Sequence, residues 1–126
     1  MKTILIVEDN EKNMKLVRDI LRHKGHATLE AMTGLDGVRL ALQERPDLIL
    51  MDIQLPDIDG IEVLRRIRED ESLDAVPVVA VSASVMPDDQ QKIVNSGFDA
   101  FITKPINLKQ FQDTVQHFLA QGRRPR

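Results

Sequence analysis

The stretch from Asp47 to Pro56 constrains the fold most strongly, because four consecutive apolar residues, Leu48 to Met51, run directly into the carboxylate of Asp52. A short apolar run between polar residues and a proline is typical of a strand buried on both faces of a parallel sheet. Such a strand ends at the rim of the sheet, where open α/β sheets bind their ligands. We therefore expect Asp52 to lie at a functional edge.

A second stretch near the N-terminus repeats this pattern, since the apolar run Ile4 to Val7 is followed by Glu8 and Asp9. An Asp after a strand is often only a cap or a turn residue. Two buried strands that both end in acid, however, would bring three carboxylates to one edge, where they repel one another unless a cation lies among them. The pattern favours a metal site built from oxygen ligands, with Asp52 at its centre.

The composition narrows the class of protein. The chain has 126 residues, a net charge of −3 and no cysteine. This length fits one domain, the charge argues against a nucleic-acid-binding surface, and the lack of cysteine excludes disulfides and thiol chemistry. The N-terminal apolar run is too short for a signal peptide, and no run approaches membrane-spanning length. We expect a soluble, cytoplasmic domain over residues 1–122, a basic tail at 123–126, no output domain, and neither a nucleic-acid nor a membrane partner.

Strand and helix patterns alternate five times along the chain. Alternation of this kind predicts an α/β fold with a parallel sheet covered on both faces by helices. The strands are predicted at Thr3–Val7, His26–Glu30 (the weakest, at an edge), Leu48–Met51, Val78–Val81 and Ala100–Thr103. The helices are predicted from about Asn10 to Lys24, from the turn at Thr33–Gly37 to before Pro46, from Ile61 through Ile67, from Pro87 to before Gly97, and from Asn107 to before Gly122.

The helices differ in the strength of their apolar faces. The fourth has only two large apolar residues, Ile93 and Val94, so we expect it to be held least firmly and to be the element that moves. The residues expected to face the core are Leu35, Val38, Leu42 and Ala41 in the second helix, and Leu108, Phe111, Val115, Phe118 and Leu119 in the fifth.

In a parallel sheet the loops after four of these strands share one edge, and they carry Glu8 with Asp9, Asp52, Ser82 and Lys104. Mg²⁺ suits such a set, because it prefers carboxylate oxygens and often binds phosphate as well. A carboxylate can act as a nucleophile and form an acyl phosphate, and a metal, a lysine and a hydroxyl would then orient the phosphoryl oxygens. Lys104 or Ser82 alone would be an ordinary surface or strand-end residue; their joint occurrence predicts a site.

These residues belong to four motifs that together resemble the receiver domain of two-component response regulators, over essentially the whole chain. The motifs are Val7-Glu8-Asp9-Asn10, Leu50-Met51-Asp52-Ile53-Gln54-Leu55-Pro56, Val81-Ser82-Ala83 and Thr103-Lys104-Pro105. The segments from Val7 to Leu16 and from Pro46 to Pro56 also resemble stand-alone receivers of the DivK type, which control division and differentiation, although receivers of hybrid histidine kinases share much of them. The resemblance implies a flavodoxin-like, doubly wound sheet of five strands in the order 2-1-3-4-5, with five helices.

The resemblance also implies a role for each residue of the site. Two positions depart from the commonest family pattern, since Ser82 stands where threonine is more usual and Phe101 where many members have tyrosine. The implied roles are phosphoacceptor and Mg²⁺ ligand for Asp52, direct Mg²⁺ ligand for Asp9, ligand through water for Glu8, ligand through its backbone carbonyl for Gln54, switch hydroxyl for Ser82, pairing cation for Lys104 and rotating aromatic for Phe101. The family further implies a cis peptide bond at Lys104–Pro105.

A member of this family is expected to accept a phosphoryl group from a histidine kinase or a histidine phosphotransfer protein. It would then signal through protein contacts on the face made by the fourth helix, fifth strand and fifth helix, or pass the group on. It is not expected to be an enzyme beyond self-phosphorylation and autodephosphorylation. Three alternatives stay open. A Mg²⁺-dependent aspartyl phosphatase would usually carry a second Asp at the position of Gln54. A flavodoxin-like carrier would need a phosphate loop in place of Glu8-Asp9-Asn10-Glu11. The third is a phosphorylation-independent scaffold.

Overall fold

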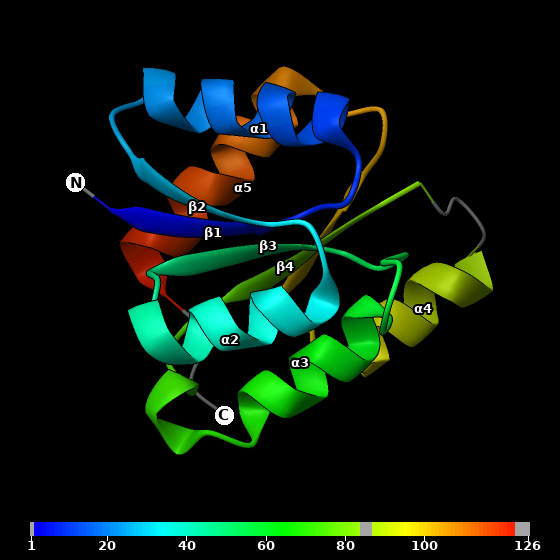
Figure 1. The fold of residues 1–126 in the computed structure, drawn as a ribbon. Coiled ribbons are helices and arrows are strands. Elements are labelled where there is room, and N and C mark those ends of the chain that lie inside the picture. Colours follow the sequence, from blue (N-terminus) through cyan, green and yellow to red (C-terminus); the bar gives the residue numbers. More distant parts are fainter. Residues whose placement is uncertain (1, 84–86, 123–126) are drawn as a thin grey trace.

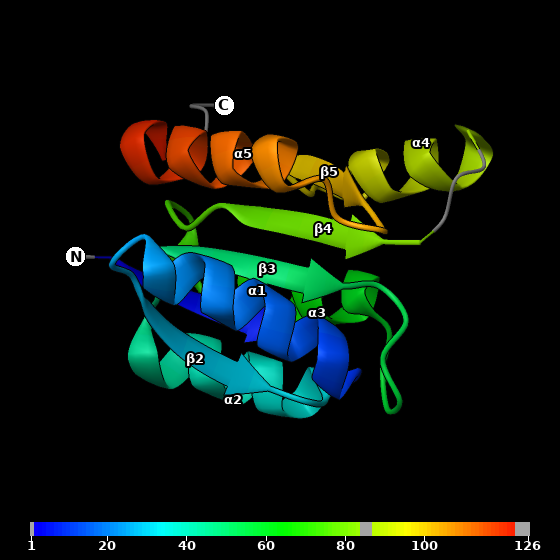
Figure 2. The same cartoon turned by 90° about the horizontal axis from the view of Figure 1, so that it is seen from above.

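The computed structural model describes residues 2–83 and 87–122, and in this part of the chain a five-stranded parallel sheet forms the centre of the fold (Figures 1 and 2). The order β2-β1-β3-β4-β5 confirms the predicted topology. β1 and β5 have the predicted bounds, and β2, an edge strand as predicted, is shifted by one residue. The strands are β1 Thr3–Val7, β2 Ala27–Ala31, β3 Leu48–Asp52, β4 Val78–Ser82 and β5 Ala100–Thr103.

Helices cover both faces of this sheet, which confirms the doubly wound arrangement. Figure 1 shows α1 and α5 on one face and α2, α3 and α4 on the other. The two sides of the sheet accordingly form two apolar cores. The helices are α1 Glu11–His23, α2 Gly34–Glu44, α3 Gly60–Arg68, α4 Pro87–Asn95 and α5 Leu108–Gln121, with a short 3-10 helix, η1 Glu71–Leu73, that the sequence did not predict.

Side-chain caps define where several of these helices begin. Asn10, Thr33 and Asn107 precede α1, α2 and α5, and each accepts a hydrogen bond from a backbone N–H in the first turn. Such a cap satisfies one of the donors that a helix start leaves unpaired. The bond from the Gln110 N–H to Asn107 Oδ1, 2.9 Å, confirms the predicted start of α5 at Asn107. Gly25 and Gly97 follow α1 and α4 with positive φ, as expected of residues that end helices.

Several large apolar residues predicted to face the core are exposed instead. Leu35 and Leu42 of α2 are 51% and 38% exposed, because the buried residues of this helix are Gly34, Gly37 and Ala41. These small residues let α2 lie very close to the sheet: a Cβ at Gly37 would stand 2.9 Å from Val7 Cγ2. Ala41 was predicted to face the core, and Val38, also predicted there, packs against the core while partly buried.

Two further predictions of burial are wrong. Val94 of α4 is 50% exposed and Leu108, the first residue of α5, is 53% exposed. Ile93 is buried, so α4 relies on this one large side chain among those of its residues that the structure describes. The remaining anchors of α5 are confirmed, since Phe111, Val115 and Phe118 are buried and Leu119 packs against the same core.

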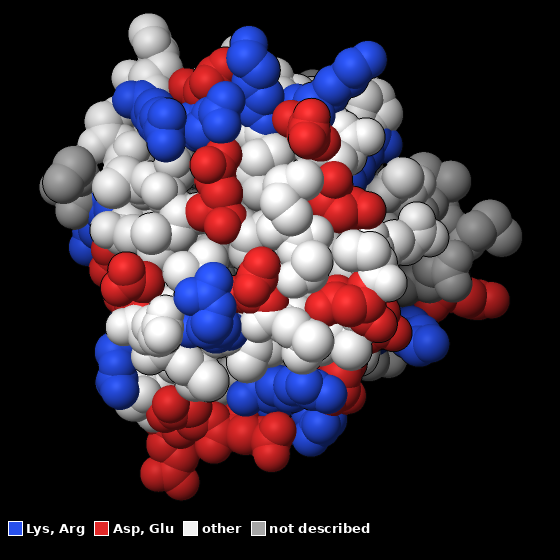
Figure 3. All heavy atoms as spheres, viewed as in Figure 1, with Lys and Arg blue, Asp and Glu red and all other residues white. Residues whose placement is uncertain are grey.

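The surface carries charges of both signs. Figure 3 shows Lys and Arg interspersed with Asp and Glu over the face in view, so no patch of a single sign dominates that face. Across the described residues, every helix is too short or too polar to cross a membrane.

Candidate functional site

Three carboxylates meet where β1 and β3 end. These strands pair in parallel with Val7 opposite Met51, so the residues that follow, Glu8 and Asp52, emerge side by side. One carboxylate oxygen from each of Glu8, Asp9 and Asp52 lies within 4.8 Å of the others. Glu8 and Asp52 are buried, at 4% and 7% exposure, whereas Asp9 is exposed. The structure therefore brings together the three predicted acids, with two in the interior and one open to solvent.

Lys104, which follows the edge strand β5, contacts two of these acids. Its Nζ lies 2.8 Å from Glu8 Oε1 and 3.2 Å from Asp52 Oδ2. The Lys104 N–H donates to the carbonyl oxygen of Ser82 at 3.0 Å, which continues the β4–β5 pairing beyond the strand ends. The Lys104–Pro105 peptide bond is cis, as predicted. The parallel topology thus carries a cation from the end of β5 to acids at the ends of β1 and β3.

Burial and neighbouring charges both shift the pKa values of Glu8 and Lys104. Burial raises the pKa of Glu8, the hydrogen bond from Lys104 opposes the rise, and the neighbouring Asp52 adds to it. Burial alone would lower the pKa of Lys104, but its contacts with Glu8 and Asp52 outweigh this effect and raise the pKa. Lys104 consequently stays charged beside Glu8 and Asp52.

The donor set fits a hard divalent cation. Carboxylate oxygens are the ligands that Mg²⁺ prefers, and Mg²⁺ keeps several of its waters. The exposed Asp9 leaves one side of the cluster open for those waters and for a phosphoryl group, while Glu8 and Asp52 supply buried negative charge. The residues present therefore suit Mg²⁺ as the sequence predicted.

The other predicted residues lie around the cluster. The Gln54 N–H donates to Asp52 Oδ1 at 3.2 Å, and the Gln54 side chain is exposed, so its backbone is the part near the acids. Ser82, 4% exposed, ends β4 one residue after Val81, which is opposite Asp52 in the sheet. Phe101 is partly buried in β5 and packs against the core on the side of α2, α3 and α4, outside the charged cluster. Its predicted rotation stays a prediction.

Sequence reasoning missed the support of the loop between β3 and α3. The Asp57 carboxylate accepts hydrogen bonds from the backbone N–H groups of Gly34, at 2.7 Å, and Leu35, at 2.9 Å. The Gly60 N–H donates to the Ile53 carbonyl oxygen at 2.8 Å and closes the loop. The only sequence signal is an acid next to Pro56, which is also typical of an ordinary turn.

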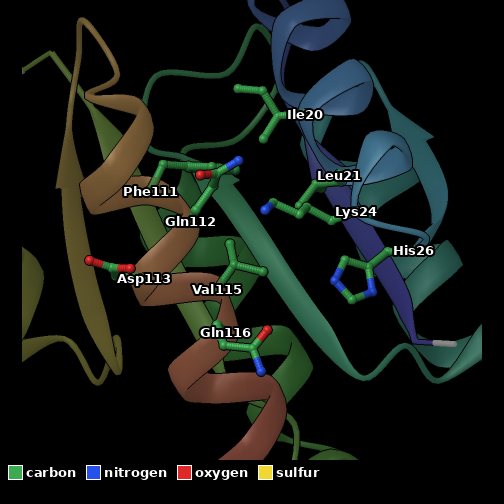
Figure 4. A pocket seen from close by; sticks show the side chains of 9 residues that line it. All are labelled: Ile20, Leu21, Lys24, His26, Phe111, Gln112, Asp113, Val115 and Gln116. Carbon is green, nitrogen blue, oxygen red and sulfur yellow. The ribbon is translucent and has the colours of Figure 1, made fainter.

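A cavity of about 200 Å³ lies elsewhere, between α1 and α5 (Figure 4). Leu21, Phe111 and Val115 form its apolar lining, and the ring of His26 projects into it toward Val115 and Gln116. None of the acids of the cluster lines this cavity. The chemistry predicted from the sequence is therefore concentrated at the acid cluster.

Comparisons with known proteins agree with this geometry. The family model described as "Response regulator receiver domain" matches residues 4–116. The chain is 45% identical over 121 residues to the polar-differentiation response regulator DivK of Brucella anthropi, covering 96% of this chain and 98% of that protein.

Solved structures give the same picture. The receiver domain of the sensor histidine kinase PA1611 from Pseudomonas aeruginosa, which has a magnesium ion coordinated in its active-site cleft, is similar with a TM-score of 0.89 and 32% identity over 95% of this chain and 98% of that one. A CheY-like receiver domain protein from Methanospirillum hungatei has a TM-score of 0.87 and 27% identity, covering 96% and 95% of the two chains.

Proposed function

Since the chain belongs to the response regulator receiver domain family, we propose that it is a signalling protein in which Asp52 accepts a phosphoryl group from a histidine kinase or a histidine phosphotransfer protein. The observation that carries this proposal is the setting of Asp52. Its carboxylate is almost fully buried, one oxygen contacts Lys104, the other accepts the Gln54 N–H, and two further acids stand beside it.

The transfer step follows from these positions. A carboxylate oxygen of Asp52 attacks phosphorus and forms an O–P bond, while the P–N bond of the donor's phosphohistidine breaks and its electron pair returns to the imidazole, which takes a proton from solvent. Lys104, already 3.2 Å from Asp52, would pair with a phosphoryl oxygen, and Ser82 would donate its hydroxyl hydrogen to another. Asp9 and Asp52 directly, Glu8 through water and Gln54 through its carbonyl would hold Mg²⁺. When bound, the ion supplies positive charge to the phosphoryl oxygens.

Phosphorylation by acetyl phosphate in the presence of Mg²⁺ tests the proposal. Intact-mass spectrometry should show one added phosphoryl group on the wild-type protein and none on Asp52→Asn. Asp47→Asn is a matched control, because Asp47 lies just before the same strand at its opposite end, where it accepts the Thr3 N–H at 2.8 Å. This control should be labelled like the wild type. Equal labelling of Asp52→Asn, or an unmodified wild type, would remove the central assignment.

We further propose that the output surface is the face made by α4, β5 and α5. Ile93 is the buried anchor of α4, whereas Gln91, Lys92 and Val94 are exposed and free to contact a partner. Asp89, predicted on the same surface, has a side chain outside the part that the structure describes. α4 also lies in the chain between Ser82 and β5. We therefore expect a movement of the Ser82 hydroxyl toward a phosphoryl group to displace α4 first.

Hydrogen exchange tests this output surface. The amides of residues 87–104 should change protection when Mg²⁺ and a beryllofluoride phosphoryl mimic are added to the protein. Changes confined to the loops after Asp9 and Asp52 would contradict the proposed switch. Because the DivK relative is named for polar differentiation, we propose polar differentiation and cell division as the process that this surface controls. The cytoplasmic location stays a prediction.

The alternative functions, a phosphatase or a phosphorylation-independent scaffold, predict different experimental results. Gln54 stands where an aspartyl phosphatase usually carries its acid/base carboxylate, which disfavours turnover of small phosphate esters. A phosphorylation-independent scaffold would capture the same partner with Asp52→Asn as with the phosphorylated wild type. We expect the partner to distinguish the two forms by about 1–3 kcal/mol, a typical coupling energy between two sites.

A further inference from the structure

The loop that connects β3 to α3, residues 53–59, is attached to a helix from another part of the chain. Asp57 accepts one hydrogen bond on each carboxylate oxygen, from Gly34 N–H at 2.7 Å and from Leu35 N–H at 2.9 Å. Hydrogen bonds from backbone N–H groups, the one from Leu35 first, lower the pKa of Asp57, so the carboxylate keeps its charge in neutral solution. The loop therefore has a charged, two-point attachment to the first turn of α2.

Close packing surrounds this attachment. A Cβ at Gly34 would stand 2.6 Å from Ile58 Cγ1 and 3.0 Å from the Ile58 carbonyl oxygen, so only a glycine lets the loop and helix meet at this distance. Three residues later, Gly37 packs in the same way against Val7, the last residue of β1 before Glu8. The first turn of α2 thus contacts the loop on one side and the end of β1 on the other.

These contacts add a second link between the segments that carry the acid cluster, beside the direct pairing of β1 with β3. Glu8 and Asp9 extend from β1, whereas Asp52 and Gln54 belong to β3 and its loop. Two other hydrogen bonds of the loop, from Gln54 N–H to Asp52 and from Gly60 N–H to Ile53, lie within the β3–α3 connection itself, and Asp59 caps α3 by accepting the Glu62 N–H. They fix its shape, whereas the pairing of β3 with β1 ends at Met51 and the Asp57 contacts hold the loop beyond the strand against α2.

We propose that Asp57 is a positioning residue for the metal: by holding the 53–59 loop against α2, it sets where the Gln54 backbone stands relative to Glu8 and Asp9. This inference rests on the proposed function, in which Gln54 contributes a ligand. A purely structural cap is the competing explanation. α2, however, already has its own cap, because Thr33 Oγ1 accepts the Asp36 N–H at 3.1 Å.

Mg²⁺ titrations of the full chain distinguish the two roles. Calorimetry or amide NMR is needed, since the chain has no Trp. Asp57→Asn should weaken Mg²⁺ affinity about tenfold, the lower end of the effect of removing groups that orient metal ligands. Phosphorylation by acetyl phosphate should be slow at low Mg²⁺ and recover at saturating Mg²⁺, because Asp52 and Lys104 are unchanged.

Asp70→Asn is the matched control. Asp70 also caps a short helix, with Oδ1 accepting the Ser72 N–H at 2.9 Å, and the substitution removes the same charge away from the loop. It should leave Mg²⁺ affinity unchanged. Gly34→Ala approaches the same contact from α2 and should weaken Mg²⁺ binding as Asp57→Asn does, which covers the case of one variant failing to fold.

Two results distinguish a failure of this inference from a failure of the proposed function. If Asp57→Asn lowers the melting temperature but binds Mg²⁺ like the wild type, Asp57 is only a cap and the inference is overturned. If the wild-type protein itself neither binds Mg²⁺ nor becomes phosphorylated, the proposed function fails instead.

Discussion

Removing the ammonium group of Lys104 should destabilise the metal-free protein strongly. The Lys104 Nζ contacts Glu8 at 2.8 Å and Asp52 at 3.2 Å. At an effective dielectric constant of about 20, each contact represents roughly 5–6 kcal/mol of Coulomb attraction, most of which offsets the cost of burying the ions. Breaking a buried pair typically costs about 3–5 kcal/mol. Because the Lys104 side chain keeps 16% exposure and Glu8 can take up a proton, we expect the lower end, about 3 kcal/mol, for Lys104→Met.

This loss should depend on pH, and the sign follows from Glu8. The pKa of Glu8 is raised above its ordinary value of 4.5, so its protonation favours the folded state. That stabilisation is fully present below pH 4.5 and is lost as the pH rises through the raised pKa. Lys104 lowers the pKa of Glu8, so its removal raises this pKa further. The difference between Lys104→Met and wild type should be largest at neutral pH and shrink in acid, and Mg²⁺ should also reduce it.

Urea unfolding followed by far-UV circular dichroism measures the effect, since Trp fluorescence is not available in this chain. With a urea m-value of about 2 kcal/mol/M, a loss of 3 kcal/mol lowers the midpoint by roughly 1.5 M. Lys15→Met is the control, because Lys15 pairs with Asp19 at 3.7 Å with both side chains exposed, and its loss should stay below about 1 kcal/mol. An equal midpoint for Lys104→Met and wild type, or a loss unaffected by both pH and Mg²⁺, would refute the electrostatic account of the cluster.

Three further predictions concern packing and charge. Gly60→Ala should cost about 1–3 kcal/mol in urea unfolding and slow phosphorylation, because its Cβ would meet a backbone carbonyl oxygen of β3 at 2.5 Å; wild-type values would contradict the close approach. Phe111→Ala should cost about 3–5 kcal/mol, since the ring is fully buried, whereas Leu108→Ala, half exposed in the same helix, should stay within about 0.5 kcal/mol. In an NMR titration Glu62 should have a pKa of about 2, because Arg65 donates to its carboxylate. The stabilisation from this contact is present above pH 4.5 and is lost as the pH falls through about 2.

The parts of the fold that the sequence predicts well are those in which one local pattern has one structural meaning. β1 and β5 have the predicted bounds, because a short apolar run in an alternating α/β pattern has few other interpretations. β2 is shifted by one residue, since its apolar alternation is weak. η1 was missed because three residues are too few to show a period. The meeting of Glu8, Asp52 and Lys104 was predictable, because parallel strands place their carboxyl ends at one edge.

The errors on α2 have a physical cause that bears on the site. Pattern reasoning assigned Leu35 and Leu42 to the inner face together with Val38 and Ala41, because large apolar side chains usually provide burial. Ala41 is buried and Val38 packs against the core, but Gly34 and Gly37 take the place expected for the two leucines. Small residues carry little hydrophobic signal, yet they are what lets a helix approach a strand end and a loop within contact distance. The carboxylate of Asp57, 22 residues from Leu35, shows only in the folded chain that this approach is also fixed by hydrogen bonds. The helix with these wrong predictions of burial is therefore the one that contacts both the end of β1 and the 53–59 loop beside the acid cluster, as expected where local rules yield to the geometry of a site.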